Sequence, residues 1–271
     1  MQLRDEHGYT FIHPFDDENV IAGQGTIGLE LLDQLPDVEA VVVPVGGGGL
    51  ISGVAYAVKS LNPNVKVYGV QASGAPSMVN SLHDHKQEKL AKVSTIADGI
   101  AVKEPGSVTF DICLRYVDDI VTVSEDEICA AILHLIESEK MVAEGAGAAS
   151  VAAVMFNKVP VKGKKTICVV SGGNIDVTIL SRVINRGLAK SGRICTLIIE
   201  LADKPGQLLK VCQVIAAQGG NIVSVYHERN NDSKKVTDCV LRLSVETKNQ
   251  EHVESITKAL TDNGLKIREN I

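Results

Sequence analysis

The chain has 271 residues, of which 45% are hydrophobic and 22% are charged, and its formal net charge is −6. This composition is typical of a soluble globular protein with one or two domains, and the acidic balance gives no reason to expect binding to nucleic acid or to an anionic membrane. No apolar run is long enough to span a bilayer, and the first residues lack the apolar segment of a signal peptide. The six cysteines are scattered without a CxxC pair, so we expect reduced thiols and a cytoplasmic location.

The first two thirds of the chain alternate short apolar runs with longer amphipathic runs, which predicts strands and helices in turn. The predicted strands are residues 9–12, 40–45, 66–71, 119–123 and 166–170, and the predicted helices are residues 25–34, 50–60, 76–82, 125–139, 145–157 and 175–187. Ser124, followed three residues later by Glu127, predicts a capped helix start. The runs AVVVPV and TICVV are apolar throughout, which is typical of strands covered on both faces and predicts an α/β domain with a parallel sheet.

The pattern changes near Leu188. The small, polar stretch GLAKSGR predicts a linker, and the residues after it predict a strand, a helix, two strands, a helix and a last strand. This βαββαβ order is that of a ferredoxin-like unit. We therefore predict two domains, residues 1–188 and 194–271, joined by a linker at residues 189–193.

Two glycine-rich loops follow predicted buried strands. The stretch VVVPVGGGGLISG places four glycines between a strand and a helix, and TICVVSGGNID places Ser171 at the start of a second loop. Free N–H groups at a helix N-terminus bind anions, and ligands of parallel sheets bind at the carboxyl ends of the strands. The spacing matches neither the dinucleotide motif nor the Walker motif. The alternatives are a tightly packed turn for the glycines and a helix N-cap for Ser171.

Taken together, the segments resemble the threonine dehydratase (threonine ammonia-lyase) branch of the tryptophan-synthase-β-like pyridoxal phosphate enzymes. The matching segments, in the order of that family, are HPFDDENVIAGQGTIGLEL, PVGGGGLISG, GVQASGAPSM, ADGIAVKEPG, VDDIVTVSEDEI, EGAGAAS and VVSGGNID. The tail LADKPGQLLKVCQVIAAQGGNIVSVYHER resembles an ACT domain. The resemblance implies a fold type II, parallel-sheet enzyme domain, incomplete here, that deaminates L-threonine, or L-serine, to 2-oxobutanoate or pyruvate and ammonia.

The resemblance also implies a binding site for pyridoxal 5'-phosphate. Ser171 would hydrogen-bond the pyridine nitrogen, and Glu144 matches an acidic position near the cofactor, although its alternative role is to complement a helix dipole. The cofactor phosphate would be bound by backbone N–H groups of Gly46, Gly47, Gly48, Gly49 and Leu50.

A second family feature concerns metal binding. Gln71, Ala75 and Ser77 fall in a segment that binds a metal or a monovalent cation in some relatives. Those relatives commonly have a carboxylate where this chain has Gln71, and a neutral amide weakens a divalent site. We therefore expect no metal.

One essential part of the family pattern is missing. The Schiff-base lysine of the family lies in a motif resembling S-[FY]-K-x-R, and neither this motif nor the family's Ser-x-Gly-Asn-His segment occurs here. We therefore expect a fragment that lacks its N-terminal part and its catalytic lysine and that is inactive alone. The other hypothesis is a non-catalytic remnant that senses amino acids; a cysteine- or serine-handling enzyme of the same fold is less favoured.

The ACT-like tail implies an effector site at the turn DKPGQL and the stretch GGNI. This turn leads into a helix whose free N–H donors suit a carboxylate. The resemblance implies a small-molecule amino acid such as isoleucine or valine as allosteric effector and a homo-oligomer, either a dimer or a tetramer. It leaves open whether the role is catabolic or belongs to isoleucine biosynthesis. An oligomerisation module without a ligand is the alternative. The candidate effector-binding residues are Asp203, Pro205, Gly206, Gln207, Leu208, Asn221 and Ile222.

Overall fold

The computed structural model describes residues 2–229 and 238–268 and divides the chain into two compact units, Met1–Val183 and Ile184–Ile271. The division falls inside helix α8 (Val177–Lys190). The predicted linker, residues 189–193, therefore begins within the last turn of this helix. Within the described residues, no helix is long and apolar enough to cross a membrane.

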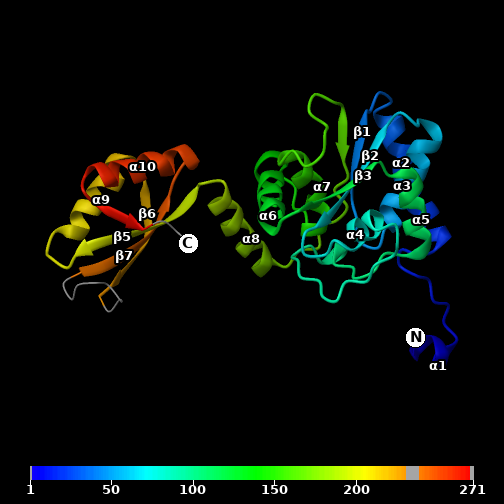
Figure 1. The fold of residues 1–271 in the computed structure, drawn as a ribbon, viewed down its shortest axis with the longest axis horizontal. Coiled ribbons are helices and arrows are strands. Elements are labelled where there is room, and N and C mark those ends of the chain that lie inside the picture. Colours follow the sequence, from blue (N-terminus) through cyan, green and yellow to red (C-terminus); the bar gives the residue numbers. More distant parts are fainter. Residues whose placement is uncertain (1, 230–237, 269–271) are drawn as a thin grey trace. The chain divides into compact units, whose positions relative to one another are not determined.

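The first unit is built on a parallel sheet of four strands in the order β3-β2-β1-β4, as the sequence predicts. Every residue of β1 is buried, because helices cover both faces of the sheet (Figure 1). Alternate side chains of β1 accordingly enter two separate cores, Val41 and Val43 on one face and Ala40 and Val42 on the other. The strands are β1 (Ala40–Pro44), β2 (Lys66–Ala72), β3 (Asp119–Val123) and β4 (Thr166–Cys168).

The helices of this unit pack in two groups. One core contains side chains of α2 (Glu18–Gln34), α3 (Gly49–Leu61), α4 (Ser77–His83) and α5 (Ser107–Tyr116). The other core contains side chains of α6 (Glu125–His134), the π-helical turn Leu135–Glu139 and α7 (Gly145–Met155), together with the first half of α8. Figure 1 shows α6 and α7 on the side of the sheet opposite α2, α3 and α5. The short α1 (Gln2–His7) and a 3₁₀ turn at Asp98–Ile100 complete the unit.

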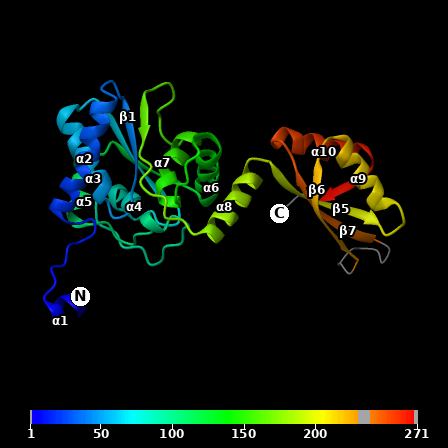
Figure 2. The ribbon, with the colours of Figure 1, turned by 180° about the vertical axis from the view of Figure 1, so that it is seen from behind.

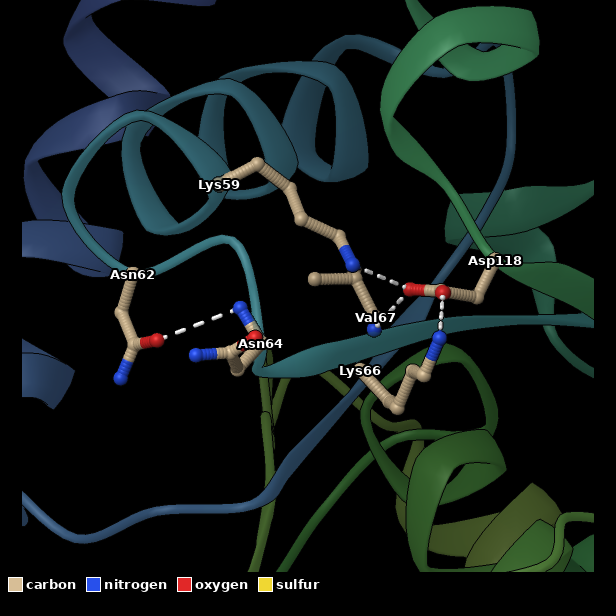
Figure 3. Close-up of polar contacts among 6 residues, drawn as sticks. All are labelled: Lys59, Asn62, Asn64, Lys66, Val67 and Asp118. Atoms are coloured by element: carbon tan, nitrogen blue, oxygen red, sulfur yellow. Dashed lines mark hydrogen bonds and ion pairs between the residues drawn. The ribbon is translucent and has the colours of Figure 1, made fainter.

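Local polar contacts fix where several of these elements begin. The predicted capping box is present, because the Ser124 hydroxyl accepts from the backbone N–H of Glu127 and the Glu127 carboxylate accepts from the N–H of Ser124. Asp118 ties α3 to β2 just before β3 begins (Figure 3). Its carboxylate accepts from the ammonium groups of Lys59 and Lys66, each at 2.7 Å, and from the backbone N–H of Val67 at 2.8 Å.

The second unit has the predicted βαββαβ order. Its antiparallel sheet has the strand order β6-β7-β5-β8, and α9 and α10 cover one face (Figure 2). This face carries Ile199, Leu241 and Leu243, which form the core together with Ile215 of α9 and Ile256 of α10. The elements are β5 (Ile194–Ala202), α9 (Gln207–Ala217), β6 (Asn221–Glu228), β7 (Asp238–Glu246), α10 (Gln250–Asp262) and β8 (Lys266–Arg268). The predicted turn at residues 230–235 lies outside the described residues.

Some predicted boundaries were wrong. Residues 9–12 form no strand; instead, the side chains of Tyr9, Phe11 and Ile12 are more than half exposed. Helix α2 begins seven residues before the predicted start, because the Asp17 carboxylate caps it by accepting from two backbone N–H groups. Helix α5 was not predicted. Its acceptor, Asp16, lies far away in the sequence, and its carboxylate accepts from three N–H groups of the first helical turn.

Candidate functional site

The predicted cofactor residues all line one cavity of the first unit. Its volume is about 590 Å³, and it opens at the carboxyl ends of the neighbouring parallel strands β1 and β4. This is where ligands of open parallel sheets bind. The predicted residues in its lining are Gly46, Gly47, Gly48, Gly49, Leu50, Glu144 and Ser171.

The four glycines form a close-packed turn with free backbone donors. Gly48 has φ +101°, a left-handed conformation that favours glycine, and it is the N-cap of α3. A Cβ atom at Gly48 would lie 2.7 Å from the Met78 side chain and 2.8 Å from that of Thr109. Among the described residues, no acceptor takes the N–H groups of residues 46–50. The glycine run is therefore a tightly packed turn, and it also presents a row of N–H donors of the kind that suits an anion.

One carbonyl of the loop, that of Gly47, accepts hydrogen bonds from the N-terminal end of α5. The Thr109 hydroxyl donates to the Gly47 carbonyl at 2.6 Å, and the N–H of Gly106 donates to the same oxygen at 3.1 Å. Asp16 in turn caps α5, so that the start of α5 is anchored on the segment before α2. Burial opposes ionisation of Asp16, but hydrogen bonds from Ser107, Val108 and Thr109 outweigh it and lower its pKa below the ordinary value.

The Glu144 side chain lies against the second glycine loop, which begins with Ser171. A Cβ atom at Gly172 would lie 2.5 Å from a carboxylate oxygen of Glu144, which places this carboxylate directly against the loop that begins with Ser171. Glu144 occupies the N-cap of α7, but its side chain makes no capping hydrogen bond. Ser171 is exposed and does not cap α8; Asp176 accepts from the first N–H groups of that helix instead. The N-cap alternative for Ser171 was therefore wrong.

The donor set of this cavity fits a phosphorylated aromatic ligand. Free N–H groups at the start of α3 suit a dianionic phosphate, and the Ser171 hydroxyl can donate to or accept from a ring nitrogen. The Phe15 side chain, which sequence reasoning missed, lies over the glycine loop and also lines the cavity. No lysine among the described residues lines it.

Gln71 is fully buried in the segment where some relatives bind a metal. Its amide oxygen accepts from the N–H groups of Met78 and Val79 at 2.9 Å each, and its amide nitrogen donates to the carbonyl of Val45. Ser77 donates to the carbonyl of Val102, and Ala75 is buried in the same region. Gln71 therefore serves to position the start of α4.

A second cavity, of about 460 Å³, lies in the second unit. It brings together five of the predicted effector residues, namely Asp203, Pro205, Gly206, Gln207 and Leu208. The other two lie elsewhere: the Asn221 side chain donates to Glu246, and Ile222 packs against the core. The cavity also contains His227, Arg229 and Cys239, which the sequence analysis did not single out. The bulge between Ile222 and Ser224 turns His227 to this face, and strict alternation could not have placed it.

Comparison with known proteins assigns a separate family to each of the two units. Residues 1–173 match the family described as pyridoxal-phosphate dependent enzyme, and residues 191–263 match the ACT domain. The chain is 50% identical over 268 residues to an L-threonine ammonia-lyase of Thermotoga maritima, covering 99% of this chain and 67% of that enzyme. It is 44% identical over 260 residues to an L-threonine ammonia-lyase of Geobacter sulfurreducens, covering 96% and 65%. The chain thus spans about two thirds of the length of these relatives.

Solved structures show the same relationship. Threonine deaminase isoform 2 from Solanum lycopersicum is 42% identical with a TM-score of 0.65, over 68% of this chain and 55% of that one. Serine racemase from Dictyostelium discoideum is 40% identical with a TM-score of 0.60, over 65% and 57%. The chain therefore belongs to the pyridoxal-phosphate-dependent enzyme family, on its threonine ammonia-lyase branch, and carries an ACT domain.

Proposed function

We propose that the first cavity binds pyridoxal 5'-phosphate and forms one wall of a threonine dehydratase site. The row of free N–H groups at residues 46–50 carries this proposal, because unpaired donors at a helix N-terminus favour a bound phosphate. When bound, the cofactor supplies the electron sink for removal of the substrate's hydroxyl and amino groups. The chain's own residues bind the phosphate, orient the ring through Ser171 and place the Glu144 carboxylate beside it.

Within these 271 residues, we propose that deamination of L-threonine or L-serine does not occur. The reaction needs an amine that holds the cofactor and moves the substrate's α-proton. Lysines of the described residues lie away from the cavity; Lys59, for example, is paired with Asp118 on the far end of α3. A catalytic lysine supplied by a further segment would complete the site.

The first experiment mixes the purified chain with pyridoxal 5'-phosphate, records the absorbance spectrum and then adds borohydride. We expect reversible binding that inorganic phosphate displaces, with no cofactor attached to lysine after reduction. Attachment to a single lysine beside the glycine loop, mapped by peptide mass spectrometry, would contradict the proposed inactivity. Supplying the part of the Thermotoga maritima enzyme that this chain does not match, as a second chain, should restore 2-oxobutanoate formation from L-threonine.

We also propose that the ACT domain binds a small amino acid such as isoleucine or valine. The second cavity supports this, because it combines the N-terminal turn of α9, where no acceptor among the described residues takes the N–H groups of Leu208 and Leu209, with the Asp203 carboxylate, a pairing suited to the two ends of an amino acid. Binding is measured by calorimetry on the whole chain, with lysine as a mismatched control. If isoleucine binds and the second-chain experiment yields no 2-oxobutanoate, the non-catalytic sensor becomes the better hypothesis.

A homo-oligomer, a dimer or a tetramer, is the assembly we propose. Strand β6 is at the edge of its sheet, and the side chains of Val223, Val225 and Tyr226 on it are 58%, 39% and 61% exposed. An exposed apolar edge strand favours pairing with another sheet edge. Light scattering of the whole chain and of a Val223→Lys variant tests this, and a monomeric mass for the unaltered chain would contradict it.

A further inference from the structure

One group of possible metal ligands lines the cavity of the second unit, and the proposed effector site uses only one of its three members, Asp203. His227 lies on β6, Cys239 lies on the neighbouring strand β7, and Asp203 lies directly after β5, the strand on the other side of β7. One ligand atom from each residue lies within 4.8 Å of the other two. The register explains the meeting, because Leu201 pairs with Cys239 and His227 pairs with Leu241. His227 and Cys239 therefore point to the helix-covered face of the sheet, and Asp203, in the turn after β5, brings its carboxylate to the same place.

We propose that Asp203, His227 and Cys239 bind one Zn²⁺ ion. Thiolate, imidazole and carboxylate are the three ligand types of zinc sites, whereas Mg²⁺ and Ca²⁺ prefer oxygen ligands alone. The thiolate and the carboxylate together balance the two charges of the ion. This inference does not depend on the proposed dehydratase activity.

The distances leave room for an ion after small side-chain rotations. The His227 Nε2 atom and the Asp203 Oδ1 atom are 3.8 Å apart. Two ligands of a tetrahedral zinc ion lie about 3.4 Å from each other, as follows from metal–ligand distances near 2.1 Å. The side chains of His227 and Asp203 are 34% and 36% exposed, so they can rotate, while Cys239 is buried and fixed.

Arg229 contacts the Asp203 carboxylate on the oxygen that does not face His227. Its Nε atom forms an ion pair with Oδ2 of Asp203 at 3.1 Å, and Oδ1 of the same carboxylate lies 3.8 Å from Nε2 of His227. A polar partner of this kind orients a ligating carboxylate in many metal sites. On the other side, the trio faces the cavity of about 460 Å³, so a water molecule can fill the fourth position.

Metal binding changes the state of one ligand. A cysteine thiol is largely protonated at neutral pH, because its ordinary pKa is about 8.5. When the S–Zn bond forms, the S–H bond breaks and its proton passes to solvent. No electron transfer is involved.

The test uses the whole chain after treatment with a chelator, titrated with Co²⁺ in the presence of a non-thiol reductant and without any amino acid. We expect a thiolate-to-cobalt charge-transfer band in the near ultraviolet that saturates at one Co²⁺ per chain and is removed by an equimolar amount of Zn²⁺. Cys239→Ser should abolish the band. His227→Gln and Asp203→Asn should each weaken Co²⁺ binding at least about tenfold, since even outer residues of metal sites have effects of that size.

Cys212→Ser is the matched control, because Cys212 is a half-buried thiol of α9 in the same unit and is not among the ligands. Its band and its affinity for Co²⁺ should equal those of the unaltered chain. Absence of the band, its persistence in Cys239→Ser, or its equal loss in Cys212→Ser would overturn the proposal. If Cys239→Ser fails to fold, as judged by circular dichroism, the partly exposed Asp203→Asn decides the question.

Discussion

Thr109 holds the carbonyl of Gly47 with a hydrogen bond of 2.6 Å and thereby joins α5 to the glycine loop. The side chain of Thr109 is fully buried, and the same hydroxyl also lies 3.2 Å from the carbonyl of Gly106. The N–H groups of the loop thus remain available at the cavity, whereas the Gly47 carbonyl is hydrogen-bonded to Thr109 and Gly106. This polarity is what an anion site needs, since a carbonyl turned toward a phosphate would repel it.

Replacing Thr109 by Val should therefore weaken both the fold and the site. Valine has a similar shape but no hydroxyl, so the Gly47 carbonyl keeps only its contact with the N–H of Gly106. We expect a loss of about 1–2 kcal/mol in the free energy of unfolding, measured with urea, and weaker binding of pyridoxal 5'-phosphate. Thr26→Val, at an exposed position of α2, is the control and should change neither quantity by more than about 0.5 kcal/mol.

Gly48→Ala should abolish cofactor binding. A Cβ atom there would force Met78 and Thr109 to move, and alanine at φ +101° adds about 1–2 kcal/mol of strain. Gly23→Ala makes the same chemical change inside α2, where nothing lies within 4 Å of the added atom, and should stabilise that helix by up to about 1 kcal/mol. Equal cofactor binding by both variants, measured by absorbance, would contradict the assignment of the loop.

Asp118→Asn should destabilise the first unit and remove part of its acid sensitivity. Burial opposes ionisation of Asp118, but Lys59, Lys66 and the N–H of Val67 outweigh it and lower its pKa below the ordinary 3.8. Its stabilising effect is therefore complete above that ordinary value and is lost as the pH falls through the lower folded-state pKa. At neutral pH the variant leaves the largely buried ammonium of Lys59 without its partner, and we expect a loss of about 2 kcal/mol.

Urea unfolding at several pH values measures this effect. The difference between the unaltered chain and Asp118→Asn should shrink below the ordinary pKa. Asp37→Asn, which breaks an exposed pair with Lys165, serves as the control and should leave the stability unchanged. A difference that persists unchanged in acid would show that the carboxylate charge of Asp118 does not stabilise the fold.

Gly206→Ala tests the effector cavity. Gly206 has φ +90° and begins α9 beside Asp203, whereas Gly219 has φ +82° at the opposite end of the same helix. Neither residue has an atom within 4 Å of an added Cβ, so both substitutions impose a similar torsional strain of about 1 kcal/mol. Calorimetric binding of isoleucine should be lost in Gly206→Ala and retained in Gly219→Ala. Loss in both variants would point to strain alone.

Elements with local signals in the sequence could be predicted, and elements defined by distant partners could not. The buried strand at β1 follows from its unbroken apolar run, and the start of α6 follows from Ser124 and Glu127, three residues apart. Helix α5 has no such signal, because the carboxylate that caps it belongs to Asp16, about ninety residues earlier. Residues 9–12 read as a strand because they are apolar and alternate, but among the described residues no strand pairs with them.

The candidate sites follow the same rule. The glycine loop and Ser171 could be found because each follows an apolar strand, and parallel strands bring their carboxyl ends to one edge of the sheet. The strand before Ser171, β4, lies at the edge of the sheet and is only half-buried, so the expectation that it is covered on both faces was wrong. The approach of His227 to Asp203 could not be found, because it depends on a bulge in β6 and on the pairing of three strands. Asn221 and Ile222 were assigned to the effector site from the family pattern of the turn, and the structure places them outside the cavity.

The contact between Phe15 and the glycine loop has a consequence for how this region can evolve. A Cβ atom at Gly47 would lie 2.4 Å from the ring of Phe15, whereas one at Gly49 would meet the backbone of residue 15, and Gly48 is held by its left-handed torsion. Positions 15 and 47 should therefore covary, with a small side chain at 15 permitting alanine at 47. A smaller side chain at position 15 would not permit alanine at position 48 or 49, because the constraint at 48 is its backbone torsion and the constraint at 49 is the backbone of residue 15. Three adjacent and chemically identical residues are thus under three different constraints, and only the first of them can be lifted by a change elsewhere in the chain.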